Sequence, residues 1–182
     1  MRAWYAVLVG ALALQRRHEL ALSKRLEAAR PGRRAAARSF PLMVAVHVGL
    51  FVLPPLEAHL AHRRPHWVGL WLALLATATG LRWWSIRSLG DQWNVRAAVP
   101  EDLQPVTLGP YRWIRHPNYL AVILEFAALP LAGGAWISAI GLSALNGAVL
   151  VDRIMAEEAL LAEAPGYPQA FAGKARFIPG IF

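Results

Sequence analysis

Apolar residues recur along this chain in windows of about the length that crosses a lipid bilayer, roughly 20 residues. Four such windows occupy residues 40–60, 67–89, 119–131 and 135–151, and the third continues past Gly133 and Gly134. A fifth segment, residues 3–14, is shorter, but a helical spacing of apolar residues continues from it to Ala29. The pattern predicts an all-α integral membrane protein with about five transmembrane helices, folded as one domain over residues 1–182.

The first apolar segment has two interpretations. Residues 11–13, Ala-Leu-Ala, resemble the small-x-small cleavage site of a signal peptide. Only Arg2 precedes the apolar residues, however, and the helical pattern continues beyond them, so we interpret the segment as a first helix. We expect this helix to leave the membrane and run along its surface, with Arg16 and Arg17 reaching to the polar boundary.

The positions of the basic residues predict the orientation in the membrane, because lysine and arginine gather in cytoplasmic loops. All of the 19 Lys and Arg residues except Arg2, Arg63 and Arg64 fall between the first two helices, towards the end of the third or after it, or after the fifth. We therefore expect the N-terminus outside, and the C-terminus and residues 90–118 in the cytoplasm. A bacterial inner membrane is the expected location.

Composition agrees with a membrane protein and excludes several other classes. The chain is 57% hydrophobic and only 16% charged, with a mean hydropathy of +0.37. Its net charge of +8 comes from basic residues that border apolar segments, which favours anionic lipids rather than nucleic acid as partners. The absence of cysteine excludes radical chemistry at a cysteine-bound iron–sulfur cluster.

Polar residues of the second half gather on the predicted cytoplasmic side. Residues 90–116 are rich in Pro and Gly, so we expect a long loop, which in a small protein usually has a function. The C-terminal tail ends in ARFIPGIF, residues 175–182, and is expected to pack back on the bundle or the membrane surface. Together the loop and the tail should form a cytoplasmic cap.

The stretch YRWIRHPNYL, residues 111–120, places polar chemistry where the fourth helix begins. Pro117 suits the first turn of a helix, which makes His116 the N-cap and leaves backbone N–H donors free for a carboxylate. The plain alternative is that these Arg, Tyr and Trp residues only anchor the helix at the interface. Physical reasoning from this stretch alone leaves both interpretations open.

A second polar group follows the last apolar window. Arg153 and Glu157 are four residues apart on one predicted helix, beside Glu158. The plain interpretation is an exposed ion pair that contributes about 0.3–0.5 kcal/mol. Ionisable residues that emerge directly from an apolar span instead tend to face a cavity.

Three segments together resemble the isoprenylcysteine carboxyl methyltransferase family: VTLGPYRWIRHPNYLAVI, DRIMAEEALL and YPQAFAGKARFIPGIF, within about residues 93–182. The resemblance implies a membrane methyltransferase that uses S-adenosyl-L-methionine without a Rossmann domain. It also implies that Arg153 faces the substrate. The cofactor-binding residues that it implies are Leu103, Gln104, Pro105, Val106, Tyr111, His116, Pro117, Asn118, Tyr119 and Glu157.

These residue types suit methyl transfer to an oxygen. A helix start and His116 can bind the cofactor carboxylate, and Glu157 can accept from its amino or hydroxyl groups. Arg153 would hold an anionic acceptor in line with the methyl carbon. A carboxylate acceptor needs no base, whereas a phenol must lose its proton, to Tyr119 or to a bound water.

The acceptor stays open at this point. Asn118 stands where serine is common in the family, and compact relatives are typical of bacteria, which generally lack prenylated proteins. The acceptor is expected to be lipophilic, either isoprenylcysteine-like or an alkylpyrone or alkylresorcinol. The alternatives are a phospholipid N-methyltransferase, which an acceptor-facing arginine disfavours, and a non-enzymatic lipid-binding membrane protein.

The remaining polar and aromatic residues have weaker assignments. Glu125, inside the fourth helix, is expected to line a cavity or pair with an arginine such as Arg82, and a substrate contact is a further possibility. His47 is interpreted as a hydrogen-bonded core histidine. Interfacial anchoring is expected for Glu57, His59, His62 and His66, without a metal, and for Trp83, Trp84 and Trp113, which can also wall a lipid entrance.

Overall fold

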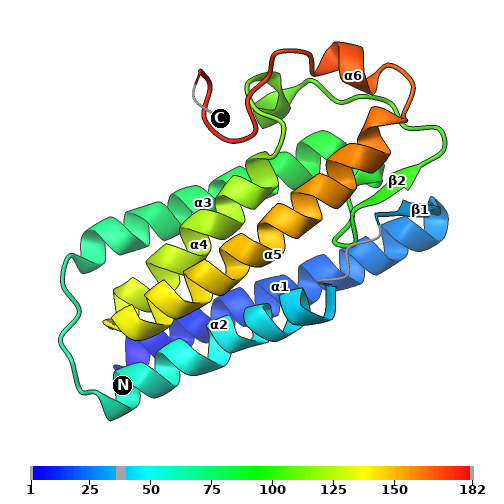
Figure 1. Cartoon of the computed structure of the whole chain (residues 1–182). Coiled ribbons are helices and arrows are strands. Elements are labelled where there is room, and N and C mark those ends of the chain that lie inside the picture. Colours follow the sequence, from blue (N-terminus) through cyan, green and yellow to red (C-terminus); the bar gives the residue numbers. More distant parts are fainter. Residues whose placement is uncertain (1, 36–39, 181–182) are drawn as a thin grey trace.

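The computed structural model describes residues 2–35 and 40–180, and in this part of the chain five long helices form an antiparallel bundle (Figure 1). Arg38, which entered the charge pattern, and the last two residues of the tail lie outside the described residues. The long helices are α1 (Ala3–Ala29), α2 (Phe40–Leu60), α3 (Val68–Leu89), α4 (Pro117–Gly133) and α5 (Trp136–Ala162). The predicted helical fold is confirmed.

The helices differ in how well each would cross a membrane by itself. Within the described residues, α2 and α5 are long and apolar enough to span a bilayer, and α4 is apolar but shorter. The charged side chains that lower the hydropathy of α1 and α3 include Arg16 and Arg82, which point into the bundle. How many of the five helices cross the bilayer stays a prediction.

The first helix takes a different course from the one that we expected from the sequence. It does not turn onto the membrane surface after residue 14 but continues unbroken along the bundle to Ala29 (Figure 1). Arg16 does not reach towards the polar boundary, because its guanidinium binds the buried carboxylates of Glu19 and Glu125. Two buried carboxylates without enough positive partners would be strongly unfavourable, which explains why this arginine points inward.

The core lies at the centre of the bundle and is built from α1, α2, α3, α4 and α5. Tyr5 of α1 is almost fully buried, and its hydroxyl donates to the carbonyl of Leu129 over 3.0 Å. This close approach requires a glycine at the end of α4, because a Cβ at Gly133 would lie 2.4 Å from the Tyr5 ring. Small residues that let backbones approach closely are typical of helix packing in membranes.

At the end of the bundle away from the cap, Glu57 has a role that the sequence did not indicate. Its carboxylate accepts hydrogen bonds from the backbone N–H groups of Ile137, at 3.1 Å, and Ser138, at 2.7 Å, in the first turn of α5. A carboxylate there satisfies donors that the helix itself leaves unpaired. Glu57 therefore caps α5, and its anchoring at the interface stays a prediction. No group of metal-binding side chains occurs in the part of the chain that the structure describes.

The opposite end of the bundle carries the expected cap of loop and tail (Figure 1). Between α3 and α4 the loop contains η1 (Gly90–Gln92), β2 (Ala98–Pro100) and η2 (Gly109–Arg112), and α6 (Tyr167–Ala170) lies in the tail. Backbone hydrogen bonds tie the tail to the start of α4, from Arg115 N–H to the Ala175 carbonyl and from His116 N–H to the Arg176 carbonyl.

The α1–α2 connection also joins the cap, which the sequence did not indicate. Its strand β1 (Gly32–Arg34) pairs antiparallel with β2. Gly32 permits this pairing, because a Cβ there would lie 2.5 Å from the Val99 carbonyl oxygen. Arg30 adds a bidentate ion pair with Asp102, at 2.8 and 3.0 Å. The connection between α1 and α2 therefore helps to hold the loop that precedes α4 in place.

Candidate functional site

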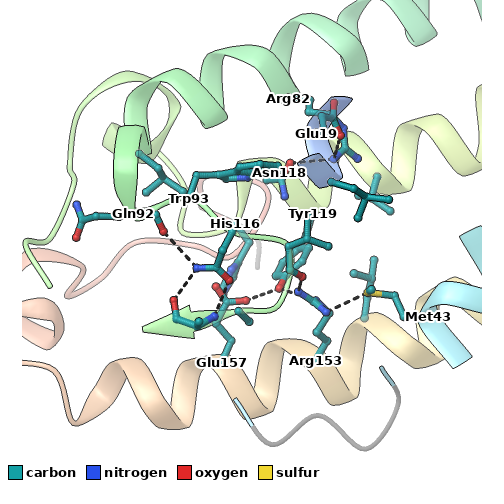
Figure 2. Close-up of a pocket in the computed structure, with 18 of the residues that line it drawn as sticks. Glu19, Met43, Arg82, Gln92, Trp93, His116, Asn118, Tyr119, Arg153 and Glu157 are labelled. Carbon is teal, nitrogen blue, oxygen red and sulfur yellow. Dashed lines mark hydrogen bonds and ion pairs between the residues drawn. The ribbon is translucent and has the colours of Figure 1, made fainter. Parts of the chain in front are cut away.

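A cavity of about 460 Å³ lies between the cap and the halves of the helices that are nearest to the cap (Figure 2). It brings together most of the residues that the sequence marked. The predicted residues on its wall are Leu103, Gln104, Pro105, Val106, Tyr111, His116, Asn118, Tyr119, Arg153 and Glu157. Pro117 and Glu125 do not line this cavity: Pro117 is buried in the first turn of α4, and Glu125 lies behind the wall.

The start of α4 has the predicted geometry, and it contacts the two adjacent glutamates of α5, Glu157 and Glu158, through different side chains. His116 is the N-cap and Pro117 follows in the first turn. The Nε2 atom of His116 lies 2.9 Å from Oε1 of Glu158, whose carboxylate also binds Arg115 and Arg176. Glu158 is thereby held away from the cavity, while Glu157 faces it. His116 acts as a support for this ion cluster as well as part of the wall.

Arg153, Tyr119 and Glu157 form a connected polar group (Figure 2). The Nε of Arg153 donates to the Tyr119 hydroxyl over 3.0 Å, and this hydroxyl in turn donates to Oε2 of Glu157. Arg153 is only 5% exposed, so the plain interpretation as an exposed ion pair is wrong, and both residues face the cavity as the alternative required. Tyr119 of α4 lies between the two charged groups of α5 because α4 packs against α5.

The guanidinium of Arg153 is fixed from three directions. Besides Tyr119, its Nη1 contacts the sulfur of Met43 at 3.0 Å, and its Nη2 donates to the Val95 carbonyl. An arginine has five N–H donors, so two remain after these contacts. Because Arg153 lines the cavity, these donors are placed for an anionic or oxygen-bearing ligand.

The loop before α4 is held in shape by two reciprocal side-chain interactions. Gln92 accepts from the backbone N–H of Gln104 and donates to its carbonyl, at 3.0 and 3.1 Å. Asn94 binds both backbone groups of Ala98 in the same way. These contacts fix residues 103–106 against the cavity. Tyr111 also lines the cavity. Burial raises the pKa of its phenol above the ordinary value, so the phenol stays protonated at neutral pH.

The sequence missed a buried ionic cluster in the wall of the cavity, to which Arg16, Glu19 and Arg82 belong. Glu19 and Arg82 are 2% and 6% exposed, and together with Arg16 and Glu125 they join α1, α3 and α4. The expected Arg82–Glu125 pair is confirmed, at 3.4 Å. Arg82 also donates to Asn118 over 3.3 Å (Figure 2). The resemblance covered only the second half of the chain and gave no signal for α1 or α3.

The aromatic residues also differ from expectation. Trp84 and Trp113 contact each other and are about half exposed, but neither they nor Trp83 line the cavity. Trp93 lines it instead and is buried (Figure 2). Its indole N–H has no acceptor among the described residues.

The other end of the cavity lies between α1 and α2 and has a mixed lining, because Arg16, Arg17 and Glu19 of α1 face it together with apolar side chains. Its walls include Leu20 of α1 and Val44, Val48, Phe51 and Val52 of α2. The three valines are 45–57% exposed, so this part of the cavity is bordered by residues that also face outward. One continuous space therefore connects the polar cap with the outer surface of two helices.

Comparison with known proteins gives two findings. The family model for the isoprenylcysteine carboxyl methyltransferase (ICMT) family matches residues 71–163, from α3 through the end of α5. A protein of Bacillus subtilis (strain 168), named uncharacterized protein YpbQ, is 32% identical over 162 residues, which cover 86% of this chain and 96% of that protein. The matched region contains the whole polar group of Arg153, Tyr119 and Glu157, and the chain belongs to the isoprenylcysteine carboxyl methyltransferase family.

Proposed function

We propose that this protein transfers a methyl group from S-adenosyl-L-methionine to a carboxylate or acidic hydroxyl of a lipophilic acceptor dissolved in the membrane. Membership of the ICMT family implies a methyltransferase that depends on this cofactor, and the acceptor is our proposal. The observation that carries it is the continuous cavity, which joins a polar cap to the space between α1 and α2, where apolar side chains of α2 line it, with Arg153 on its wall.

The polar end has the donor and acceptor groups that the cofactor needs. Glu157 can accept from an amino group or ribose hydroxyl. Residues 103–106 line the same space, and the Gln92 side chain holds the backbone of Gln104 in place there. The unpaired indole N–H of Trp93 lies beside the same space. When bound, S-adenosylmethionine supplies a methyl carbon activated by a positively charged sulfur. The residues present therefore fit this group.

Arg153 favours an acceptor with an anionic oxygen. Its two uncommitted N–H donors can bind a carboxylate or a phenolate and orient it, and positioning accounts for much of the rate of such transfers. A phospholipid amine gains nothing from a guanidinium, which argues against N-methylation. An isoprenylcysteine-like carboxylate and the acidic hydroxyl of an alkylpyrone or alkylresorcinol both satisfy this requirement.

Tyr119 provides a path for a proton when the acceptor is a hydroxyl. Its oxygen can take the proton of the acceptor while its own proton moves along the existing hydrogen bond to Glu157. A carboxylate acceptor is already ionised and needs no such step. The orientation that we propose places the cap in the cytoplasm of a bacterial inner membrane, with five spans and the N-terminus outside, because basic residues gather near the cap.

Calorimetric titration of the detergent-purified protein with S-adenosylmethionine tests the cofactor site. Glu157→Gln should weaken binding at least tenfold, because a buried charge-assisted contact is lost. Glu163→Gln is the matched control, since Glu163 is exposed near the end of the same helix and pairs with Arg33. Arg153→Met should retain cofactor binding and lose methyl transfer. A folded wild-type protein that binds no cofactor, even with lipids restored, would refute the proposal.

A further inference from the structure

His47 on α2 presents an unused hydrogen-bonding atom at the cavity. Its Nδ1 lies 2.8 Å from the Met43 carbonyl oxygen, which can only accept, so Nδ1 carries the hydrogen. In the neutral ring the lone pair is then on Nε2, which has no hydrogen-bond partner among the described residues. The sequence indicated a hydrogen-bonded core histidine. The hydrogen bond is present, but the residue also lines the cavity.

The orientation of the ring is fixed by its surroundings. Phe126 of α4 packs against it edge to face, with the ring centroids 5.1 Å apart. Val48 and Phe51 of the next helical turn line the same part of the cavity. Arg16, Arg82 and Glu125 also act on the ring electrostatically. Burial and the two arginines disfavour an imidazolium, so the neutral ring with its free lone pair is the form that a ligand meets.

The position of His47 relative to Arg153 sets the size of a ligand that reaches both. Met43, whose sulfur contacts the guanidinium of Arg153, lies four residues before His47 on α2. One such step along an α-helix is about 6 Å. His47 is therefore about one turn farther from the cap than Arg153, on the side where Val48 and Phe51 line the cavity.

We infer that His47 is a specificity-determining residue that accepts a hydrogen bond from a second hydroxyl group of the acceptor. The acceptor head then carries two oxygen functions about one helical turn apart. The first is held at Arg153 for methylation and the second is bound by His47, before the apolar chain begins. A carbonyl or ether at the second position does not suffice, because Nε2 has a lone pair and no hydrogen to donate. The inference rests on the proposed acceptor site.

Direct binding in lipid nanodiscs tests this inference without methyl transfer. The probes are a long-chain alkylphenol and the alkylbenzenediol of the same chain length, whose second hydroxyl is meta to the first. Empty nanodiscs correct for partition into lipid. The wild-type protein should bind the diol about fivefold to tenfold more tightly than the phenol, as expected for one additional hydrogen bond. The mono-methyl ether of the diol should bind like the phenol.

Three variants assign the preference to His47. His47→Phe keeps the ring volume but removes the lone pair, and it should reduce the preference for the diol to within about twofold. His47→Gln places an amide oxygen near the position of Nε2 and should retain the preference. His47→Asn is shorter, reaches only the position of Nδ1, and should lose it. Circular dichroism confirms that each variant is folded.

The outcomes separate this inference from the proposed function. Equal binding of the diol and the phenol by the wild-type protein would overturn the inference, and so would a preference that persists in His47→Phe. A preference that depends on His47, with no methylated product when the cofactor is added, would support the second-hydroxyl site and refute methyl transfer to this class of acceptor.

Discussion

Replacing Glu125 with glutamine should destabilise the protein without weakening cofactor binding. The carboxylate of Glu125 is buried with Glu19 and receives contacts from Arg16 and Arg82, so the cluster contains two positive and two negative groups. Glutamine leaves the two arginines with a single carboxylate. Because breaking one partner of a buried ion pair leaves an uncompensated charge, the expected loss of stability is about 3–5 kcal/mol.

Thermal unfolding in detergent measures this loss. For a protein of about this length, each kcal/mol lowers the melting temperature by about 2–4 °C, so Glu125→Gln should melt about 6–20 °C below the wild-type protein. The double variant Glu125→Gln/Arg82→Gln removes one charge of each sign. It should be more stable, by at least about 1 kcal/mol, than the sum of the two single changes predicts, as coupled partners require.

The cofactor affinity of Glu125→Gln should stay close to that of the wild-type protein, because Glu125 lies behind the cavity wall. This measurement separates the structural role from the substrate contact that the sequence also permitted. A melting temperature equal to that of the wild-type protein, together with a raised KM for the acceptor, would refute the structural interpretation.

Three further changes test the cap and the helix ends. Glu57→Ala should cost about 0.5–2 kcal/mol in thermal unfolding, because the first turn of α5 loses its hydrogen-bond acceptor. Gly133→Ala should cost about 1–3 kcal/mol by overpacking a tyrosine ring, whereas Gly141→Ala, with no neighbour within 4 Å, should not destabilise; equal effects would contradict this. The hydrogen bond from Arg30 lowers the pKa of Asp102, so the ion pair stabilises the protein above the ordinary pKa of about 3.9. Asp102→Asn should therefore melt below the wild-type protein at neutral pH, and the difference should disappear as the pH falls below about 4.

The sequence predicted most of the residues that line the polar end of the cavity, because these residue types are concentrated in a short segment. Pro117 marks a helix start, and the helix start places His116 and Tyr119 by local geometry alone. Glu157 and Arg153 share one helix face through their four-residue spacing. The contact through Tyr119 could not be predicted, because it depends on how α4 and α5 pack.

The pattern of apolar windows by itself determined the bundle and the order of its long helices, and the clustering of polar residues located the cap. Helical periodicity and turn residues are local properties, so they can be read without the fold. Only the tertiary structure decided which charged residues are buried. Arg16, Glu19 and Arg82 would each be unfavourable alone inside the bundle, and they lie there because packing brings opposite charges from separate helices together. The same packing places His47 beside the cavity, which no spacing in the sequence indicates.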